Sequence, residues 1–154
     1  MKVYTTNEIQ INALDFSKPK QNSMGGQHIF VNIPNKTQEE SKIRFQTPVC
    51  GLPFGMNEYK GKYNLDLQLT DTNIKDFFTD FDEKIIESAT TNSFSWFKKS
   101  MHGSVITELF KPQMKQNGNY PPLLRVKVPM KNNQFDGKVY NNNQEEISIH
   151  EIEK

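Results

Sequence analysis

The spacing of the apolar residues changes once along this chain, near position 70, and that change limits the folds available to it. Before it, the segments 28–33, 42–46 and 63–70 alternate between apolar and polar side chains, as half-buried β-strands do. After it, apolar residues recur at steps of three and four from Ile74 to Ala89, which is typical of an amphipathic helix. We therefore expect three strands followed by a long helix.

The second half of the chain continues this alternation of elements. A shorter helix is expected at 92–100, a strand at 121–128 with Arg125 and Lys127 facing solvent, and a last strand at 137–140. The five-stranded Greek-key barrel called the OB-fold has this order, with a helix between strands 3 and 4. We expect a mainly β protein with this barrel. An antiparallel sandwich is the alternative, because element order does not fix strand pairing.

The length and the termini predict the domain organisation. A chain of 154 residues suits one domain, which we expect to span 1–140 and to precede a polar, acidic tail at 141–154. Ile147, Ile149 and Ile152 in this tail could instead add a strand or dock on a partner. No run approaches the ~20 apolar residues of a membrane span, and the amino terminus lacks the apolar core of a signal peptide. A soluble, intracellular protein without membrane contact is expected.

Charge is unevenly distributed although the net charge is only +1. Seven acids and two lysines give residues 66–87 a charge of −5, whereas eight bases and two acids give residues 98–138 a charge of +6. Such separation favours a basic face that binds a polyanion. The alternative is that the charges only solvate opposite faces of the molecule.

The segment 47–63, "TPVCGLPFGMNEYKGKY", combines turn-forming residues with aromatic rings and lysines. Its prolines and glycines predict a loop, but they do not account for Phe54, Tyr59 and Tyr63 beside Lys60 and Lys62. Single-stranded nucleic acid presents a charged backbone and flat bases, and its binding proteins combine basic grooves with exposed rings. The composition of this segment therefore predicts such a ligand.

Lysines make up 17 of the 19 cationic side chains. A lysine is a mobile point charge, whereas bidentate base reading favours arginine, so contact with the nucleic-acid backbone without sequence preference is expected. DNA and RNA both remain open, because stacking does not distinguish them. The candidate nucleic-acid-binding residues are Lys42, Arg44, Phe54, Tyr59, Lys60, Lys62, Lys98, Lys111, Lys115, Tyr120, Arg125 and Lys127.

Catalytic signatures are missing from the sequence. It contains no HExxH, GxxxxGK[ST] or GxSxG pattern and no paired-cysteine metal spacing. Asp80, Asp82 and Glu83 fall on the expected solvent side of the long helix, which favours a solvated face over a metal cluster. We expect a protein that is not an enzyme, with no catalytic residue, metal or cofactor.

Five segments in order carry a family resemblance: "SMGGQHIFVNI", "IRFQTPVCGLPFGMNEY", "YNLDLQL", "NSFSWFKKS" and "ELFKPQMKQNGNYPPLLRVKVP". Together they resemble the T7-type single-stranded DNA-binding proteins of phages and large nucleocytoplasmic DNA viruses, over residues 23–140. The resemblance implies an OB-fold that coats exposed strands cooperatively during viral DNA replication, recombination or repair, and that contacts replication proteins. It places such a protein in the host cytoplasm, the nucleus or a viral replication site.

Two further expectations concern partners. Proteins of this family often carry an acidic carboxyl tail, but here the end is short and interrupted by isoleucines. The alternative function is an OB-fold protein-interaction module of a replication complex that recruits partners through its acidic helix or its tail, without binding DNA directly. The oligomeric state stays open, with a homodimer among the assemblies considered.

Overall fold

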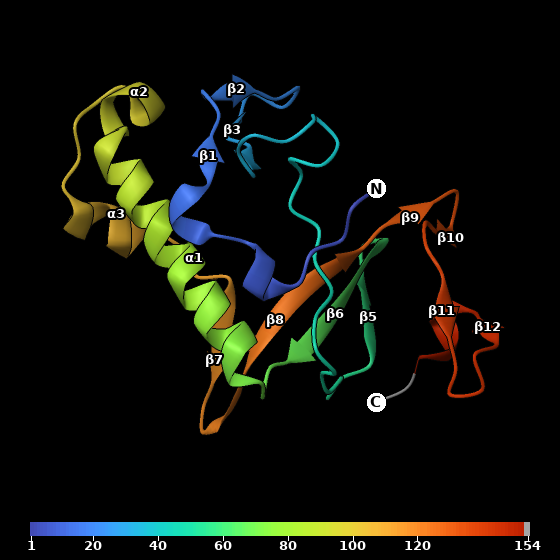
Figure 1. The fold of residues 1–154 in the computed structure, drawn as a ribbon. Coiled ribbons are helices and arrows are strands. Elements are labelled where there is room, and N and C mark those ends of the chain that lie inside the picture. Colours follow the sequence, from blue (N-terminus) through green and yellow to red (C-terminus); the bar gives the residue numbers. More distant parts are fainter. Residues whose placement is uncertain (153–154) are drawn as a thin grey trace. The chain divides into compact units, whose positions relative to one another are not determined.

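The computed structural model describes residues 1–152 and is mainly β, with several small sheets and three α-helices (Figure 1). The chain forms two compact units, each built from two stretches of sequence. Unit 1 comprises Met1–Pro48 and Asp71–Pro112, and unit 2 comprises Val49–Thr70 and the chain from Gln113 onward. The sequence-based domain, residues 1–140, therefore contains stretches of both units, and its folding as a single domain stays a prediction.

The long helix of unit 1, α1 (Thr72–Thr91), forms where the sequence predicts it. The side chain of Asp71 caps it by accepting a hydrogen bond from the Ile74 backbone nitrogen at 3.0 Å. Its buried apolar stripe includes Ile74, Phe77 and Phe78. Burying one such side chain stabilises a fold by about 1.5–3 kcal/mol, so packing of this stripe dominates the stability of the helix.

Shorter helical elements accompany α1. The predicted second helix is α2 (Ser93–Phe97), in which the Trp96 ring lies 5.7 Å from that of Phe16. The helix α3 (Gly103–Leu109) and the 3-10 turns η1 (Thr6–Glu8), η2 (Ile11–Ala13) were not predicted. They are too short to display a helical period, and η1, η2 and α3 all contact α1.

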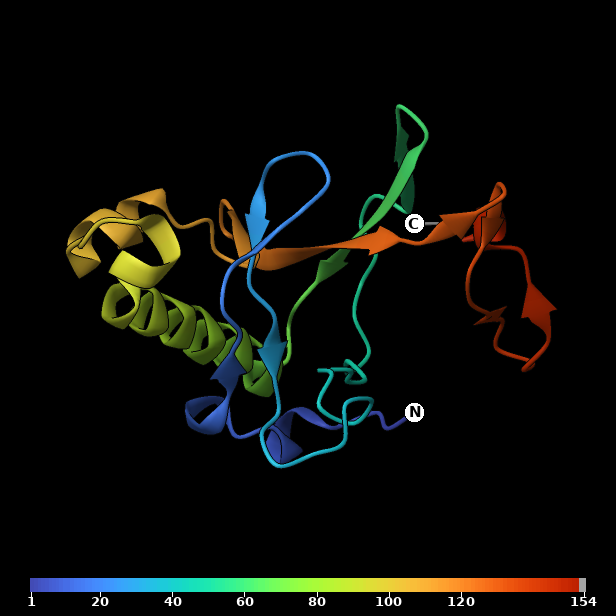
Figure 2. The same cartoon turned by 90° about the horizontal axis from the view of Figure 1, so that it is seen from above.

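One long hairpin provides the strands of unit 1 (Figure 2). β1 (Asp15–Phe16) pairs with β4 (Val31–Asn32), and β2 (Lys20–Gln21) pairs with β3 (Gln27–His28) toward the tip. The strand predicted at 28–33 is therefore present as two short pieces with a break at Ile29–Phe30.

The prediction of a strand at 42–46 is wrong. Only isolated bridges occur there, at Lys42 and Phe45. The Phe45 ring packs 5.2 Å from that of Phe77 and 5.8 Å from that of Phe78. The apolar alternation thus reflects side chains docking on α1 rather than a ladder of hydrogen bonds.

Unit 2 is built on an antiparallel sheet with the strand order β5-β6-β8-β7. Its strands are β5 (Met56–Tyr59), β6 (Lys62–Gln68), β7 (Met114–Asn117) and β8 (Tyr120–Val128). β6 and β8 were predicted. β5 and β7 were not, because each is a four-residue hairpin partner with no clean alternation.

The carboxyl-terminal part of unit 2 adds two small hairpins. They are formed by β9 (Met130–Lys131) with β10 (Gln134–Phe135), and by β11 (Val139–Tyr140) with β12 (Glu146–Ile147). β11 lies within the strand predicted at 137–140. The segment expected to be a tail contains β12 and η3 (Ile149–Glu151), and Ile149 is buried. Residues 153 and 154 of that segment lie outside the described residues.

Within residues 1–152 the strands form separate sheets and no closed barrel. The prediction of a mainly β protein is confirmed at that level. Among these residues no helix is both long enough and apolar enough to cross a membrane.

Candidate nucleic-acid interface

The sheet of unit 2 has one apolar and one polar face. Its strand register pairs Tyr63 with Val128 and Leu67 with Leu124 on the apolar side. The alternate positions form the other side, which is called the polar face below. The polar face consists of Asn57, Tyr59, Lys62, Asn64, Asp66, Gln68, Lys115, Leu123, Arg125 and Lys127.

A salt bridge lies across the middle of the polar face. Arg125 Nε donates to Asp66 Oδ1 at 2.8 Å, and the Arg125 Nη2 atom donates to Asp66 Oδ2 at 3.0 Å. The Asp66 side chain is 6% exposed and that of Arg125 is 67% exposed, so the guanidinium covers the carboxylate. An arginine has five N–H donors, and this pair uses two of them. Arg125 thus remains able to bind an oxygen-rich ligand.

The electrostatics of the pair follow from its hydrogen bonds. The Arg125 hydrogen bond lowers the pKa of Asp66 against the opposing effect of burial, and the charge of Lys115 lowers it further. The Asp66 carboxylate raises the pKa of Arg125 in the same way. The effect of Lys115 on Asp66 agrees with the strand register in placing Lys115 on this face.

The polar face carries excess positive charge. Arg125 matches the single carboxylate, Asp66, and the side chains of Lys62, Lys115 and Lys127 are exposed. The face as defined therefore has a net charge of +3. This arrangement suits the backbone of a polyanion.

A tight turn lies at one edge of the face and presents a ring. The segment 47–63, predicted to be a loop, is in part the β5–β6 hairpin, in which Lys60 and Gly61 have φ of 51° and 74°. Positive φ at both central positions is typical of a type I′ turn. Glu58 Oε1 accepts a hydrogen bond from the Gly61 nitrogen at 2.7 Å and braces the turn. Tyr59 is 69% exposed, and Lys60 Nζ lies 5.2 Å from the centre of its ring.

Three aromatic residues of unit 2 lie elsewhere. Phe54 is 47% exposed in the turn that precedes β5, and Tyr120 is exposed beside the β7–β8 turn. Tyr63 belongs to the apolar face, half-buried, with its ring 5.8 Å from that of His150. Of the predicted residues, the structure therefore brings Tyr59, Lys62, Lys115, Arg125 and Lys127 onto one face, with Lys60 at its edge.

The other predicted residues belong to unit 1. Lys42 and Arg44 both form ion pairs with Glu39 at 2.9 Å, and these contacts lower the pKa of Glu39. Lys98 follows α2 with a φ of 64°, and Lys111 is exposed after α3. The common basic surface predicted for both groups of cations stays a prediction.

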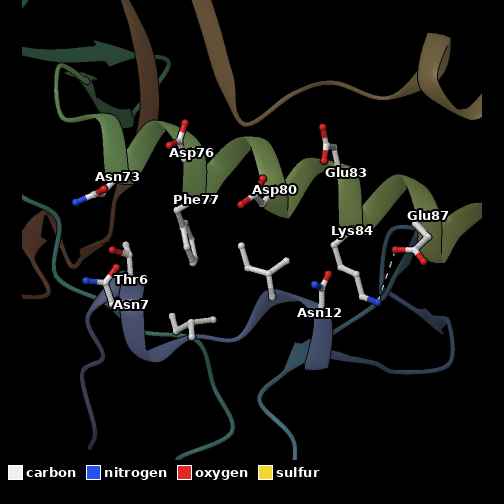
Figure 3. A pocket seen from close by; sticks show the side chains of 12 residues that line it. Thr6, Asn7, Asn12, Asn73, Asp76, Phe77, Asp80, Glu83, Lys84 and Glu87 are labelled. Atoms are coloured by element: carbon white, nitrogen blue, oxygen red, sulfur yellow. Dashed lines mark ion pairs between the residues drawn. The ribbon is translucent and has the colours of Figure 1, made fainter.

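Two hollows of unit 1 have other chemistry. A pocket of about 730 Å³ lies between α1 and the η1–η2 segment (Figure 3) and is lined by four carboxylates, those of Asp76, Asp80, Glu83 and Glu87. Lys84 is the one cation among its lining residues and pairs with Glu87 at 3.8 Å. A second hollow of about 550 Å³ is mainly apolar, and half of its lining residues lie on α1, α2 and α3. Phe16, Ile29 and Val31 of the long hairpin also line it. Neither suits a polyanion as well as the polar face does.

Asp66 is the functional residue that sequence reasoning missed. The alternation of β6 places it on the polar side, but nothing in the sequence tells which cation it meets. Among residues 1–152, no group of three or more His, Cys, Asp or Glu side chains lies close enough together to hold a metal ion.

Comparison of the chain with protein-family models, with curated proteins and with solved structures found no match. The function is therefore inferred from the chemistry of the polar face.

Proposed function

We propose that this chain binds single-stranded DNA without sequence preference and acts, without catalysis, in viral DNA replication, recombination or repair. The observation that supports this most is the exposed Tyr59 ring, with Lys60 above it, at the edge of a face with a charge of +3. A base stacks on the ring while lysines contact phosphates on either side.

The chemistry favours a single strand over a duplex. Stacking on Tyr59 requires an unpaired base and contributes about 1–3 kcal/mol. Lys60, Lys62, Lys115 and Lys127 provide point charges on flexible stems, which contact phosphates without reading bases. The three N–H donors of Arg125 that Asp66 does not use serve the same backbone.

A titration of a fluorescent dT20 oligonucleotide, followed by anisotropy, tests the proposal. If the four lysines each neutralise a phosphate, a slope of about −0.7 per contact predicts roughly a 50-fold loss of affinity between 50 and 200 mM salt. An unlabelled duplex should compete poorly, and an RNA oligonucleotide in a parallel titration decides between DNA and RNA. Absence of binding at 50 mM salt would overturn the proposal.

The proposal also includes a fold assignment that is more specific than a mainly β protein. We infer an OB-fold of the T7-type family because α1, α2 and α3 lie between β6 and β7 in the chain, as a helix connects strands 3 and 4 of that barrel. An experimental structure in which the β1–β4 hairpin and the sheet of unit 2 close into one barrel would support it. Separate sheets in such a structure would contradict the assignment.

The alternative is a protein-interaction module of a replication complex. The four carboxylates that line the pocket along α1 favour it, because they suit a basic partner better than DNA. Partners that survive nuclease treatment in a pull-down, together with no oligonucleotide binding, would favour this function over the first.

A further inference from the structure

Unit 1 presents an aromatic ring that sequence reasoning did not single out. Phe30 lies between β3 and β4 on the long hairpin and is 51% exposed. A large apolar side chain with half of its surface in water loses much of the stabilisation that burial would provide. Unlike tyrosine, phenylalanine has no hydroxyl group that would explain such a position.

A cation and a second ring surround Phe30. Lys20 Nζ lies 5.5 Å from the centre of the Phe30 ring, and the His28 ring lies 4.8 Å away at an interplanar angle of 74°. The β2–β3 register places Lys20 opposite His28, so the hairpin itself brings the three residues together.

The backbone at Phe30 is held in place. Its nitrogen donates to Ser17 Oγ at 2.9 Å, and its carbonyl oxygen accepts from the Ser17 nitrogen at 2.9 Å. The neighbouring residue, Val31, pairs with Phe16 in the β1–β4 ladder. The ring is therefore presented from an ordered backbone, which lowers the entropy lost on binding.

Comparison with the other lysine–ring contacts identifies the kind of site. Lys2 Nζ lies 4.6 Å from the Tyr4 ring, but Tyr4 is 3% exposed and its hydroxyl donates to the Glu40 carbonyl, so that contact is structural. The Lys60–Tyr59 contact is exposed instead. The Phe30–Lys20 contact is exposed in the same way as the Tyr59–Lys60 contact.

The charge around the hairpin suits a polyanion. Residues 16–38 contain no aspartate or glutamate and include three lysines, Lys18, Lys20 and Lys36. The hairpin itself, residues 15–32, contains Lys18 and Lys20 against Asp15 and so has a net charge of +1.

We propose that Phe30, with Lys20 and His28, is a second base-stacking point for single-stranded nucleic acid. An unpaired base stacks on the exposed part of the ring, and Lys20 moves from the ring to the adjacent phosphate. The inference depends on the proposed function and extends it, since each unit then binds the strand through its own ring and lysine.

Substitution of Phe30 tests the inference by dT20 anisotropy. Phe30→Ala is expected to weaken binding about 5- to 150-fold, the range for loss of one stacked base. Phe30→Leu keeps apolar bulk but lacks a flat ring and should lose a similar factor, whereas Phe30→Trp should retain affinity. Lys20→Gln should make the salt slope shallower by about 0.7.

Phe94→Ala is the matched control, because Phe94 is also exposed, at 70%, but lies on α2. Circular dichroism and thermal unfolding show whether each variant folds. If wild type binds and the folded Phe30→Leu variant binds equally well, the inference is wrong and the proposed function stands. Equal losses for Phe94→Ala and Phe30→Ala would also overturn the inference. If wild type does not bind at all, the proposed function fails first.

Discussion

The proposed interface depends on two residues, one of which must be exposed and the other covered. Tyr59 is useful because it is exposed, whereas Asp66 is tolerated because it is covered, by a guanidinium that hydrogen-bonds both of its oxygens. A buried carboxylate without such a partner would lose several kcal/mol of hydration. The Asp66 carboxylate therefore orients the Arg125 guanidinium on the polar face and offsets part of the positive charge of Arg125.

Tyr59→Ala is expected to weaken dT20 binding about 5- to 150-fold, because it removes one stacking surface. Tyr59→Phe keeps the ring and should bind within a fewfold of wild type. Anisotropy titrations at fixed salt measure both. Tyr140→Ala is the control, since Tyr140 is also exposed, at 55%, but lies on β11, outside the polar face. Equal effects of the two alanine variants would contradict the assigned interface.

The Asp66–Arg125 pair predicts a pH dependence of stability. Because the pKa of Asp66 is lower in the folded chain, its contribution is fully present above the unfolded pKa, about 4, and is lost as the pH falls through the folded pKa. Urea unfolding between pH 5 and about 2 should show this loss for wild type and less of it for Asp66→Asn. Lys127→Gln removes a charge from the same face and should keep the wild-type profile. Identical profiles for Asp66→Asn and wild type would refute the prediction.

At the scale of elements, the sequence predicts helices and strands that show a long repeating pattern, and it misses strands that depend on pairing with a neighbour. α1 could be predicted because its apolar stripe from Ile74 to Ala89 repeats over more than four turns. The prediction of a strand at 42–46 was wrong because the Phe45 ring packs against Phe77 of α1, and the segment forms only isolated bridges instead of a ladder with a neighbouring strand.

The candidate interface was predictable to a similar extent. Tyr59, Lys62 and Lys127 could be named from ring content, charge and alternation. The partner of Arg125 could not, because the pairing of β6 with β8 joins segments separated by all three helices. Lys42 and Arg44 were misjudged for a local reason. Both pair with Glu39, and the alternation of apolar and polar residues does not indicate such an ion pair.

The β5–β6 turn provides a test at this scale. A methyl group on Gly61 would meet nothing within 4 Å, so Gly61→Ala acts only through its φ of 74°. A left-handed backbone disfavours alanine by about 1–2 kcal/mol, and urea unfolding should show a loss of that size. Lys60→Gly is the comparison, because Lys60 is already left-handed and its change to glycine should not destabilise. A Gly61→Ala variant as stable as wild type would contradict the turn assignment.

At the scale of the whole molecule, the net charge of +1 conceals regions of opposite sign. Carboxylates line the pocket along α1, whereas the polar face and the long hairpin carry excess lysine. In the proposed function, this separation would allow binding of a polyanion without the self-repulsion of a strongly basic protein. Among residues 1–152, the two exposed ring–lysine contacts, Lys20 with Phe30 and Lys60 with Tyr59, fall one in each unit.

A double variant tests whether both rings act on one strand. If Phe30 and Tyr59 each stack a different base of one bound strand, their substitutions should act independently on the free energy of binding. On dT20, the fold-losses of Phe30→Ala and Tyr59→Ala should therefore multiply in the double variant. Folding of the double variant is checked by thermal unfolding. A double variant no weaker than the worse single variant would show that the rings do not act on the same bound strand.

The interleaved chain path has a consequence for cleavage. The backbone passes from one unit to the other near residues 48, 70 and 112. A protease that cuts at the first of these passages releases no free unit, because residues 1–48 stay packed with the helices of the other fragment. Nicked protein should consequently migrate as a single species under native conditions and separate into two bands only in detergent.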